Sequence, residues 1–317
     1  MQSFCSQEAI QTGLPLYGTA VGEVRIWLAL EYHRPWGAKA LQESSLPPIA
    51  KEYLQSAEAN IPHSRVQFIK QGDYPNETTQ DPIFYVALTE LGNPRTYRFQ
   101  LPTYEALADL DLHKIIAGHA HYDTYLHDEP LFLVCTNGKR DLCCAKWGLP
   151  VYQAFDGQVG HQAWQTTHIG GHRYAATMVC LPHGICYGYL EPTDAAPLAE
   201  AYQHEEIWQL ERYRGRTHYN GVTQAAEYFL RKETGEHGLN HFHWLDTIDI
   251  DTDLATESSK VQQQWQVKFT EPSLDNAQSH LLEISSSMST AAYPASCDKA
   301  PKPIAEYILE KYVNLDF

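Results

Sequence analysis

Short apolar runs separated by polar turns dominate the first part of the chain. Residues 24–32 (VRIWLALEY) are almost all apolar and rich in strand formers, which predicts a buried strand. After the break at Pro47 and Pro48, apolar positions recur at helical spacing, so residues 49–59 predict a helix. Three further apolar runs predict strands, at 66–69, 83–88 and 96–101. Residues 1–118 therefore read as a mixed α/β domain.

A polar stretch at 119–130 is expected to link this region to a second domain, at 131–205. The second domain has a sharper pattern of apolar runs and turn signals. It predicts a strand at 131–134, a helix at 145–155, a strand at 164–167, a hairpin of strands at 174–181 and 185–190, and a helix at 195–204. This order of strand, helix, strand, hairpin and helix is that of a thioredoxin-like domain.

The remaining residues, 206–317, predict a C-terminal α/β extension. Helices are expected at 221–232 and 304–312, strands at 248–253, 261–269 and 280–284, and a loop at 285–292. No internal repeat of fixed period is visible. The fold class is α/β (α+β), with a thioredoxin-like domain flanked by two further α/β regions.

Composition narrows the classes of function. The chain has 317 residues, 43% hydrophobic and 20% charged, which is ordinary for a globular protein. Its net charge of −16 argues against binding to nucleic acid or an anionic membrane, because those partners are themselves negative. No apolar run is long enough for a membrane span, and the first residues lack a signal-peptide pattern, so a cytoplasmic protein is expected. Its seven cysteines are then thiols or metal ligands, and no CxxC motif is present.

Four residues carry the candidate chemistry. Cys135 ends a predicted strand, and Cys144 follows after eight residues at a predicted helix start. The helix dipole and the basic residues Lys139 and Arg140 favour thiolates, the form that binds metal. His168 and His172 flank two glycines, whose backbone can take positive φ and approach a bound group closely.

Two thiolates and two imidazoles suit either zinc or a two-iron cluster. The cysteines of zinc fingers are typically two to four residues apart, whereas the wider spacing here suits a larger object. Spacing alone leaves zinc open. Each of the four residues taken singly is more often a buried core residue than a ligand, and it is the combined pattern that favours a metal site.

The motifs resemble those of a known family, the sucrase/ferredoxin-like family, which includes thioredoxin-like ferredoxins. The strongest resemblance lies in residues 135–144, CTNGKRDLCC, and 168–175, HIGGHRYA. Weaker matches are 15–20 (PLYGTA), 27–31 (WLALE), 35–37 (PWG), 181–192 (LPHGICYGYLEP) and 213–216 (YRGR). Cys143 beside Cys144 departs from the pattern and leaves a register slip open, and Cys144 preserves the eight-residue spacing.

The resemblance implies a 2Fe–2S cluster. Cys135 and Cys144 would bind the iron that stays ferric, and His168 and His172 the reducible iron. The implied function is one-electron transfer between unidentified donor and acceptor proteins, either alone or coupled to transfer of a proton. We predict no catalytic residue, and a carrier is favoured over an enzyme. The alternatives are a zinc-stabilised structural or binding module and, as the family label suggests, a hydrolase, for which no carboxylate pair stands out.

The sequence assigns no metal or redox role to the other five cysteines. Cys143, Cys180 and Cys186 are expected to be structural. Cys5 and Cys297 stay unassigned, and a disulfide between them would require the fold to bring them together.

Overall fold

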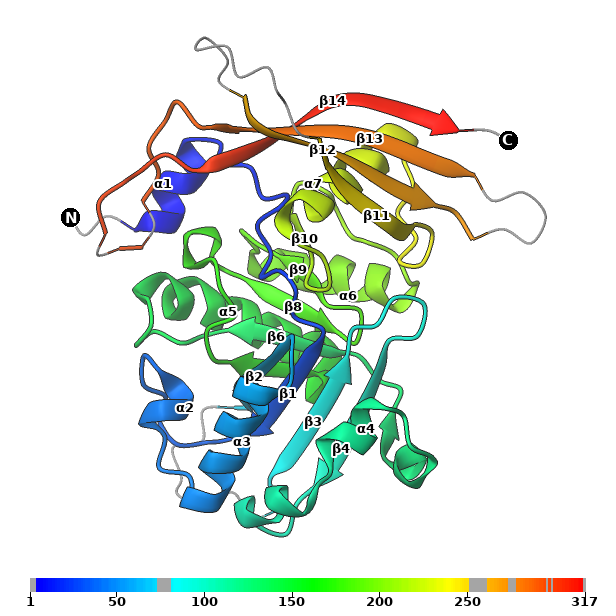
Figure 1. Cartoon of the computed structure of the whole chain (residues 1–317). Coiled ribbons are helices and arrows are strands. Elements are labelled where there is room, and N and C mark those ends of the chain that lie inside the picture. Colours follow the sequence, from blue (N-terminus) through cyan, green and yellow to red (C-terminus); the bar gives the residue numbers. More distant parts are fainter. Residues whose placement is uncertain are drawn as a thin grey trace.

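The computed structural model describes residues 4–72, 81–250, 261–272, 278–294, 296–297 and 299–315. These residues form a ten-stranded sheet and a separate four-stranded sheet, and helix α7 lies between them (Figure 1). The expected α/β class is confirmed. No helix in the described part of the chain has the length and apolar character needed to cross a bilayer.

The strands of the large sheet, in chain order, are β1 (Ile26–Glu31), β2 (Ser64–Lys70), β3 (Ile83–Leu88), β4 (Arg95–Gln100), β5 (Leu126–His127), β6 (Leu131–Cys135), β7 (Ala163–Thr166), β8 (Met178–Leu181), β9 (Ile185–Tyr187) and β10 (Tyr213–Arg216). The small sheet contains β11 (His243–Ile250), β12 (Val261–Thr270), β13 (Ser279–Met288) and β14 (Ala305–Leu315). The α-helices are α1 (Cys5–Gln11), α2 (Ala40–Glu43), α3 (Pro48–Asn60), α4 (Leu112–Ile116), α5 (Leu142–Val159), α6 (Ala195–Gln203) and α7 (Gly221–Thr234). Short 3₁₀ segments are η1 (Tyr104–Asp109), η2 (Ala120–Tyr125), η3 (Gly160–Gln162), η4 (His172–Tyr174) and η5 (Pro192–Asp194).

The large sheet is built from two halves of the same topology. Outward from the centre, one half runs β2, β1, β3, β4 and the other β7, β6, β8, β9. In each half the first two strands in the chain are parallel and joined through a helix, α3 or α5, and an antiparallel pair follows. The halves meet through the antiparallel pair β2 and β7. The second half has the strand and helix order expected for a thioredoxin-like domain, and the first half repeats it without a repeat visible in the sequence.

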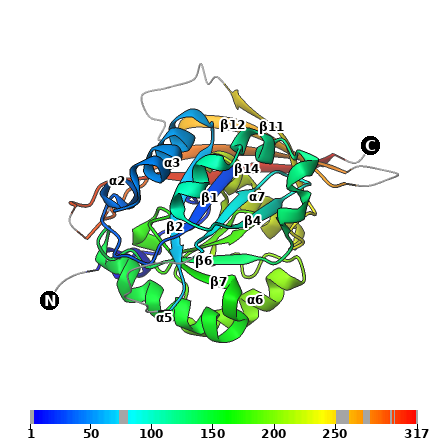
Figure 2. The ribbon, with the colours of Figure 1, turned by 90° about the horizontal axis from the view of Figure 1, so that it is seen from below.

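The two halves curve around a shared core. Alternate side chains of each strand face opposite sides of the sheet, so each half has a helix-covered face and a second apolar face. The second faces meet in one cluster that includes Trp27 and Ala29 of β1 with Leu133 of β6 and Trp164 of β7. Figure 2 shows α3 and the pair α5 and α6 on opposite outer sides. The halves are therefore packed as one body, and Cys135 lies in their common core.

Several local expectations were wrong, and the reason is strand pairing. Residues 304–312 were expected to form a helix, but they belong to β14, which pairs with β13 along its length. Residues 285–292 were expected to form a loop, but β13 continues to Met288 between β12 and β14. Hydrogen bonds to distant neighbours overrode the local pattern in both cases.

Residues 119–130 were expected to link two domains. They contain η2 and β5, Tyr122 is buried, and β5 is hydrogen-bonded to β4. The division of the chain into domains at 118, 130 and 205 itself remains a prediction. Of the strand expected at 248–253, the part described belongs to β11, and 251–253 lie outside the described residues.

A buried charge network ties α7 to the large sheet. The Glu227 carboxylate accepts hydrogen bonds from Arg216 Nε at 2.8 Å, Arg231 Nη2 at 2.9 Å and the Tyr213 hydroxyl at 2.6 Å. Burial by itself raises the pKa of Glu227, but the two guanidinium groups outweigh burial and lower the pKa to about 2. Arg216 and Arg231 are both buried together with the carboxylate that they contact.

We expect Glu227→Gln to lower the free energy of unfolding by about 3–5 kcal/mol, because it leaves two buried cations without their counter-charge. The matched control is Glu233→Gln, exposed on the same helix, for which a change below about 0.5 kcal/mol is expected. Since the Glu227 pKa is depressed in the fold, its contribution is present above the ordinary pKa of 4.5 and is lost as the pH falls toward 2. Urea unfolding at pH 7 and pH 3 measures both effects, and equal losses in the two variants would contradict the network's role.

Candidate metal centre

Strand β6 and helix α5 position the two candidate cysteine ligands. Cys135 is the last residue of β6, and Cys144 lies in the first turn of α5. Asp141 caps this helix by accepting a hydrogen bond from the Cys143 backbone amide at 2.9 Å. Gly148 lets α5 pack directly on the end of β6, since a Cβ at that position would overlap the Cys135 carbonyl. Both thiols are buried as a result.

The glycine loop after β7 positions the two histidines. Gly170 and Gly171 have φ values of 100° and 75°, which residues with a side chain rarely adopt. The loop is fastened by Arg214, a fully buried side chain that donates to the Gly170 carbonyl at 3.2 Å. A Cβ on Gly171 would run into that guanidinium group. Arg214 therefore acts on the histidine loop from inside the protein, and not as surface charge.

The structure groups three of the four predicted side chains, and it places the fourth, His172, beside His168. His168 Nδ1 lies 3.9 Å from the Cys135 sulfur and 3.7 Å from the Cys144 sulfur. These three donor atoms lie within 4.8 Å of one another, a grouping able to hold a metal. The His172 ring stacks on that of His168, with centroids 5.2 Å apart and planes 29° apart. His172 Nε2 is 3.8 Å from an Asp141 carboxylate oxygen.

Of the two cysteines, Cys135 is the one favoured as a thiolate. A hydrogen bond from the Cys144 thiol lowers the pKa of Cys135 well below its ordinary value, although burial opposes this, and His168 lowers it further. A thiolate is the form of cysteine that binds metal. Burial raises the pKa of the nearby Asp141 carboxyl, but the Cys143 amide and His172 outweigh burial and the net shift is downward. The negative charges favoured on Cys135 and Asp141 therefore favour a bound cation at this site.

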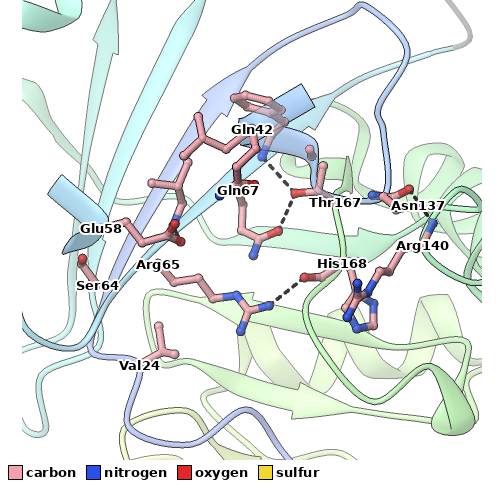
Figure 3. Close-up of a pocket in the computed structure, with 15 residues that line it drawn as sticks. Val24, Gln42, Glu58, Ser64, Arg65, Gln67, Asn137, Arg140, Thr167 and His168 are labelled. Atoms are coloured by element: carbon pink, nitrogen blue, oxygen red, sulfur yellow. Dashed lines mark hydrogen bonds between the residues drawn. The ribbon is translucent and has the colours of Figure 1, made fainter. Parts of the chain in front are cut away.

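A pocket of about 360 Å³ opens beside His168, between the two halves of the large sheet (Figure 3). Arg65 of β2 reaches across it and donates to the His168 carbonyl at 2.8 Å. On the other side Asn137 donates to the Gly37 carbonyl at 3.1 Å, which fastens the cysteine loop to the first half. His168 thus lines the pocket, whereas Cys135 and Cys144 lie in the core between the halves.

The neighbouring cysteine, Cys143, points elsewhere. Its sulfur lies 3.5 Å from that of Cys5 and 3.4 Å from that of Cys297, and Cys144 is the one grouped with Cys135 and His168. Cys180 and Cys186 are buried in the core, on β8 and β9. Sequence reasoning missed the part played by Asp141. Aspartate is common at helix N-caps, but α5 begins at Leu142, three residues before the helix expected at 145–155.

Comparison with known proteins adds a family and one relative. The profile of a family described as "Sucrase/ferredoxin-like" matches residues 16–215, which is more than half of the chain. The chain is also similar to "Altered inheritance of mitochondria protein 32" of Meyerozyma guilliermondii, with 28% identity over 97 residues. That match covers 27% of this chain and 34% of the relative, so only about a third of the relative's length is spanned. No solved structure matches significantly.

Proposed function

The chain belongs to the sucrase/ferredoxin-like family, and we propose that it is an electron-transfer protein with a 2Fe–2S cluster held by Cys135, Cys144, His168 and His172. One observation carries the proposal. Two buried thiols from β6 and α5 meet a stacked pair of imidazoles from a single glycine loop. Two sulfur and two nitrogen donors, arranged as a cysteine side and a histidine side, fit a cluster with one iron on each side.

When bound, the cluster supplies one-electron oxidation and reduction. The protein's part is to tune the reduction potential and to control the access of water. Neutral imidazoles in place of two thiolates favour the reduced state, which raises the potential relative to an all-cysteine site. Burial of Cys135 and Cys144 excludes water from the cysteine side. The pocket beside His168 supports the proposal that electrons enter and leave from the histidine side, in contact with donor and acceptor proteins.

A specific observation also favours a second candidate, a zinc-stabilised module. Cys135, Cys144 and His168 donors within 4.8 Å of one another are close enough for a single tetrahedral ion. The two candidates differ in colour, because zinc complexes of cysteine and histidine do not absorb visible light and iron–sulfur centres do.

The test is anaerobic purification followed by visible absorption and electron paramagnetic resonance of the dithionite-reduced protein. We expect charge-transfer bands, about two irons per chain and a two-iron signal. The variant His168→Ala/His172→Ala should lose or shift that signal. The control His161→Ala, an exposed histidine of the same half that contacts Glu129, should leave it unchanged. Colourless protein containing zinc, even after reconstitution with iron and sulfide, would favour the zinc module.

A further inference from the structure

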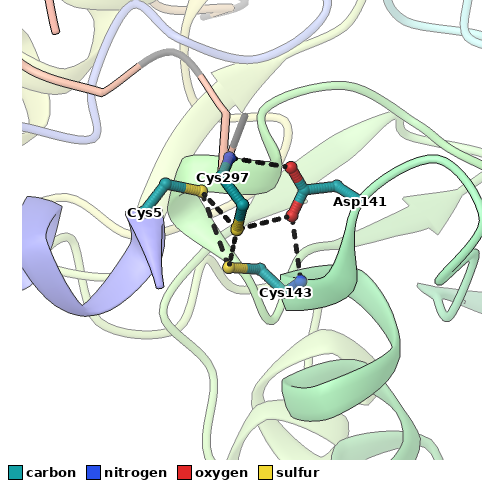
Figure 4. A group of neighbouring side chains, drawn as sticks. All are labelled: Cys5, Asp141, Cys143 and Cys297. Carbon is teal, nitrogen blue, oxygen red and sulfur yellow. Dashed lines mark hydrogen bonds between the residues drawn. The ribbon is translucent and has the colours of Figure 1, made fainter. Parts of the chain in front are cut away.

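A second group of metal-type side chains lies next to the candidate centre. It consists of Cys5 at the start of α1, Cys143 in the first turn of α5, Cys297 in the segment between β13 and β14, and Asp141, and we call it the three-cysteine cluster (Figure 4). Cys5 and Cys297 lie outside the residues matched by the family profile. The group is therefore not explained by the 2Fe–2S proposal.

The spacing of its donor atoms matches one tetrahedral ion. The three sulfur–sulfur distances are 3.5 Å for Cys5 to Cys143, 3.4 Å for Cys143 to Cys297 and 3.7 Å for Cys297 to Cys5. An ideal tetrahedron with zinc–sulfur bonds of about 2.3 Å has edges of about 3.8 Å. The Cys297 sulfur lies 3.4 Å from an Asp141 oxygen, close to the corresponding sulfur–oxygen edge of about 3.6 Å.

The distances also argue against other occupants. A disulfide would draw two sulfurs together and leave the third apart, whereas here all three are nearly equally spaced. An iron–sulfur cluster places bridging sulfides between its cysteines, and these push the cysteines on different irons farther apart than one tetrahedral edge. Three thiolates are soft ligands, which favour zinc over the oxygen-seeking cations Mg²⁺ and Ca²⁺.

The surroundings hold the ligands in place. The Ser6 hydroxyl donates to the Cys143 sulfur at 3.3 Å, and the Cys297 backbone amide donates to Asp141 at 3.3 Å. Cys5 and Cys143 are almost fully buried, among Phe4 and Trp147. Hydrogen bonds that orient the ligands and an apolar surround are what structural metal sites require. Cys297 is half-buried, so one of the three thiols is partly exposed to solvent.

We propose that the three-cysteine cluster binds one zinc ion. Zinc there joins three segments that are remote in sequence, because Cys5 and Cys297 are separated by 292 positions. Because the site is assembled only in the folded chain, the free energy of zinc binding stabilises the fold. The site fastens α1 and the segment before β14 onto the start of α5. Asp141 also contacts His172, which places the three-cysteine cluster directly beside the candidate centre.

The test is metal analysis of the full chain, purified without oxygen and incubated with one equivalent of zinc chloride before desalting. We expect about one zinc per chain in addition to iron. Cys297→Ser and Cys5→Ser should each reduce zinc about tenfold or more and leave iron unchanged. Cys180→Ser, a buried cysteine in the core under α5 and α6, is the control and should retain zinc. Circular dichroism confirms that each variant compared is folded.

Two results would overturn the zinc site, independently of the 2Fe–2S proposal. One is the absence of zinc from folded wild-type protein whose thiols titrate as reduced. The other is zinc that survives Cys297→Ser but is lost in His168→Ala/His172→Ala, which would assign the ion to the candidate centre. A second readout is hydrogen exchange: chelation of zinc should accelerate exchange in α1 and around Cys297, and leave α3 unaffected.

Discussion

Cys135→Ala should remove the visible absorption of the proposed 2Fe–2S cluster completely. Cys135 is fully buried at the end of β6, and its pKa is lowered by the Cys144 thiol and by His168. Alanine deletes the more acidic of the two thiols. Cys143 cannot take its place without breaking its contacts with Cys5 and Cys297.

Cys180→Ala is the matched control. Cys180 is also fully buried and lies on the neighbouring strand β8, but it faces the core under α5 and α6, whereas Cys135 faces the core between the halves. Both variants lose one buried sulfur, at a cost of about 1 kcal/mol or slightly more in the free energy of unfolding. Only Cys135→Ala should lose colour and iron. If Cys135→Ala protein reconstituted with iron and sulfide kept the wild-type spectrum and iron content, the proposed ligand set would be wrong.

The parts of the site that the sequence predicts are those encoded locally. A cysteine at a strand end, a cysteine in the first turn of a helix and two histidines around Gly170 and Gly171 are each recognisable from a short window. The structure places these segments at one end of the second half because β6 and β7 are parallel neighbours. Their carboxyl ends therefore meet at the same edge of the sheet.

The parts that the sequence did not predict depend on contacts between distant segments. The first half repeats the topology of the second, but its sequence has no matching motif, so the duplication was invisible. Arg214 reaches the Gly170 carbonyl across 44 positions, and the Cys143 and Cys297 sulfurs meet across 154. Strand β14 formed in place of a helix because β13 offers it a full ladder of hydrogen bonds. No window of the sequence carries such information.

The contact between α5 and β6 leads to the second large expected effect, from Gly148→Ala. A methyl group there would overlap the Cys135 carbonyl, and backbone cannot move aside as a flexible side chain can. Helix α5 must shift away from β6, and Cys144 moves with it relative to Cys135. We expect the free energy of unfolding to fall by about 3 kcal/mol or more, as for severe overpacking, and the cluster to be lost or incompletely loaded.

The same helix supplies the control. Gly157 is also in α5, is exposed, and a methyl group there would meet nothing within 4 Å. Alanine is the better helix former, so Gly157→Ala should raise the free energy of unfolding by up to about 1 kcal/mol and leave iron content unchanged. Denaturant unfolding and iron analysis of the two variants separate the effect of the contact from that of helix propensity. Comparable stability and iron content in both would show that close packing of α5 on Cys135 does not control the geometry of the centre.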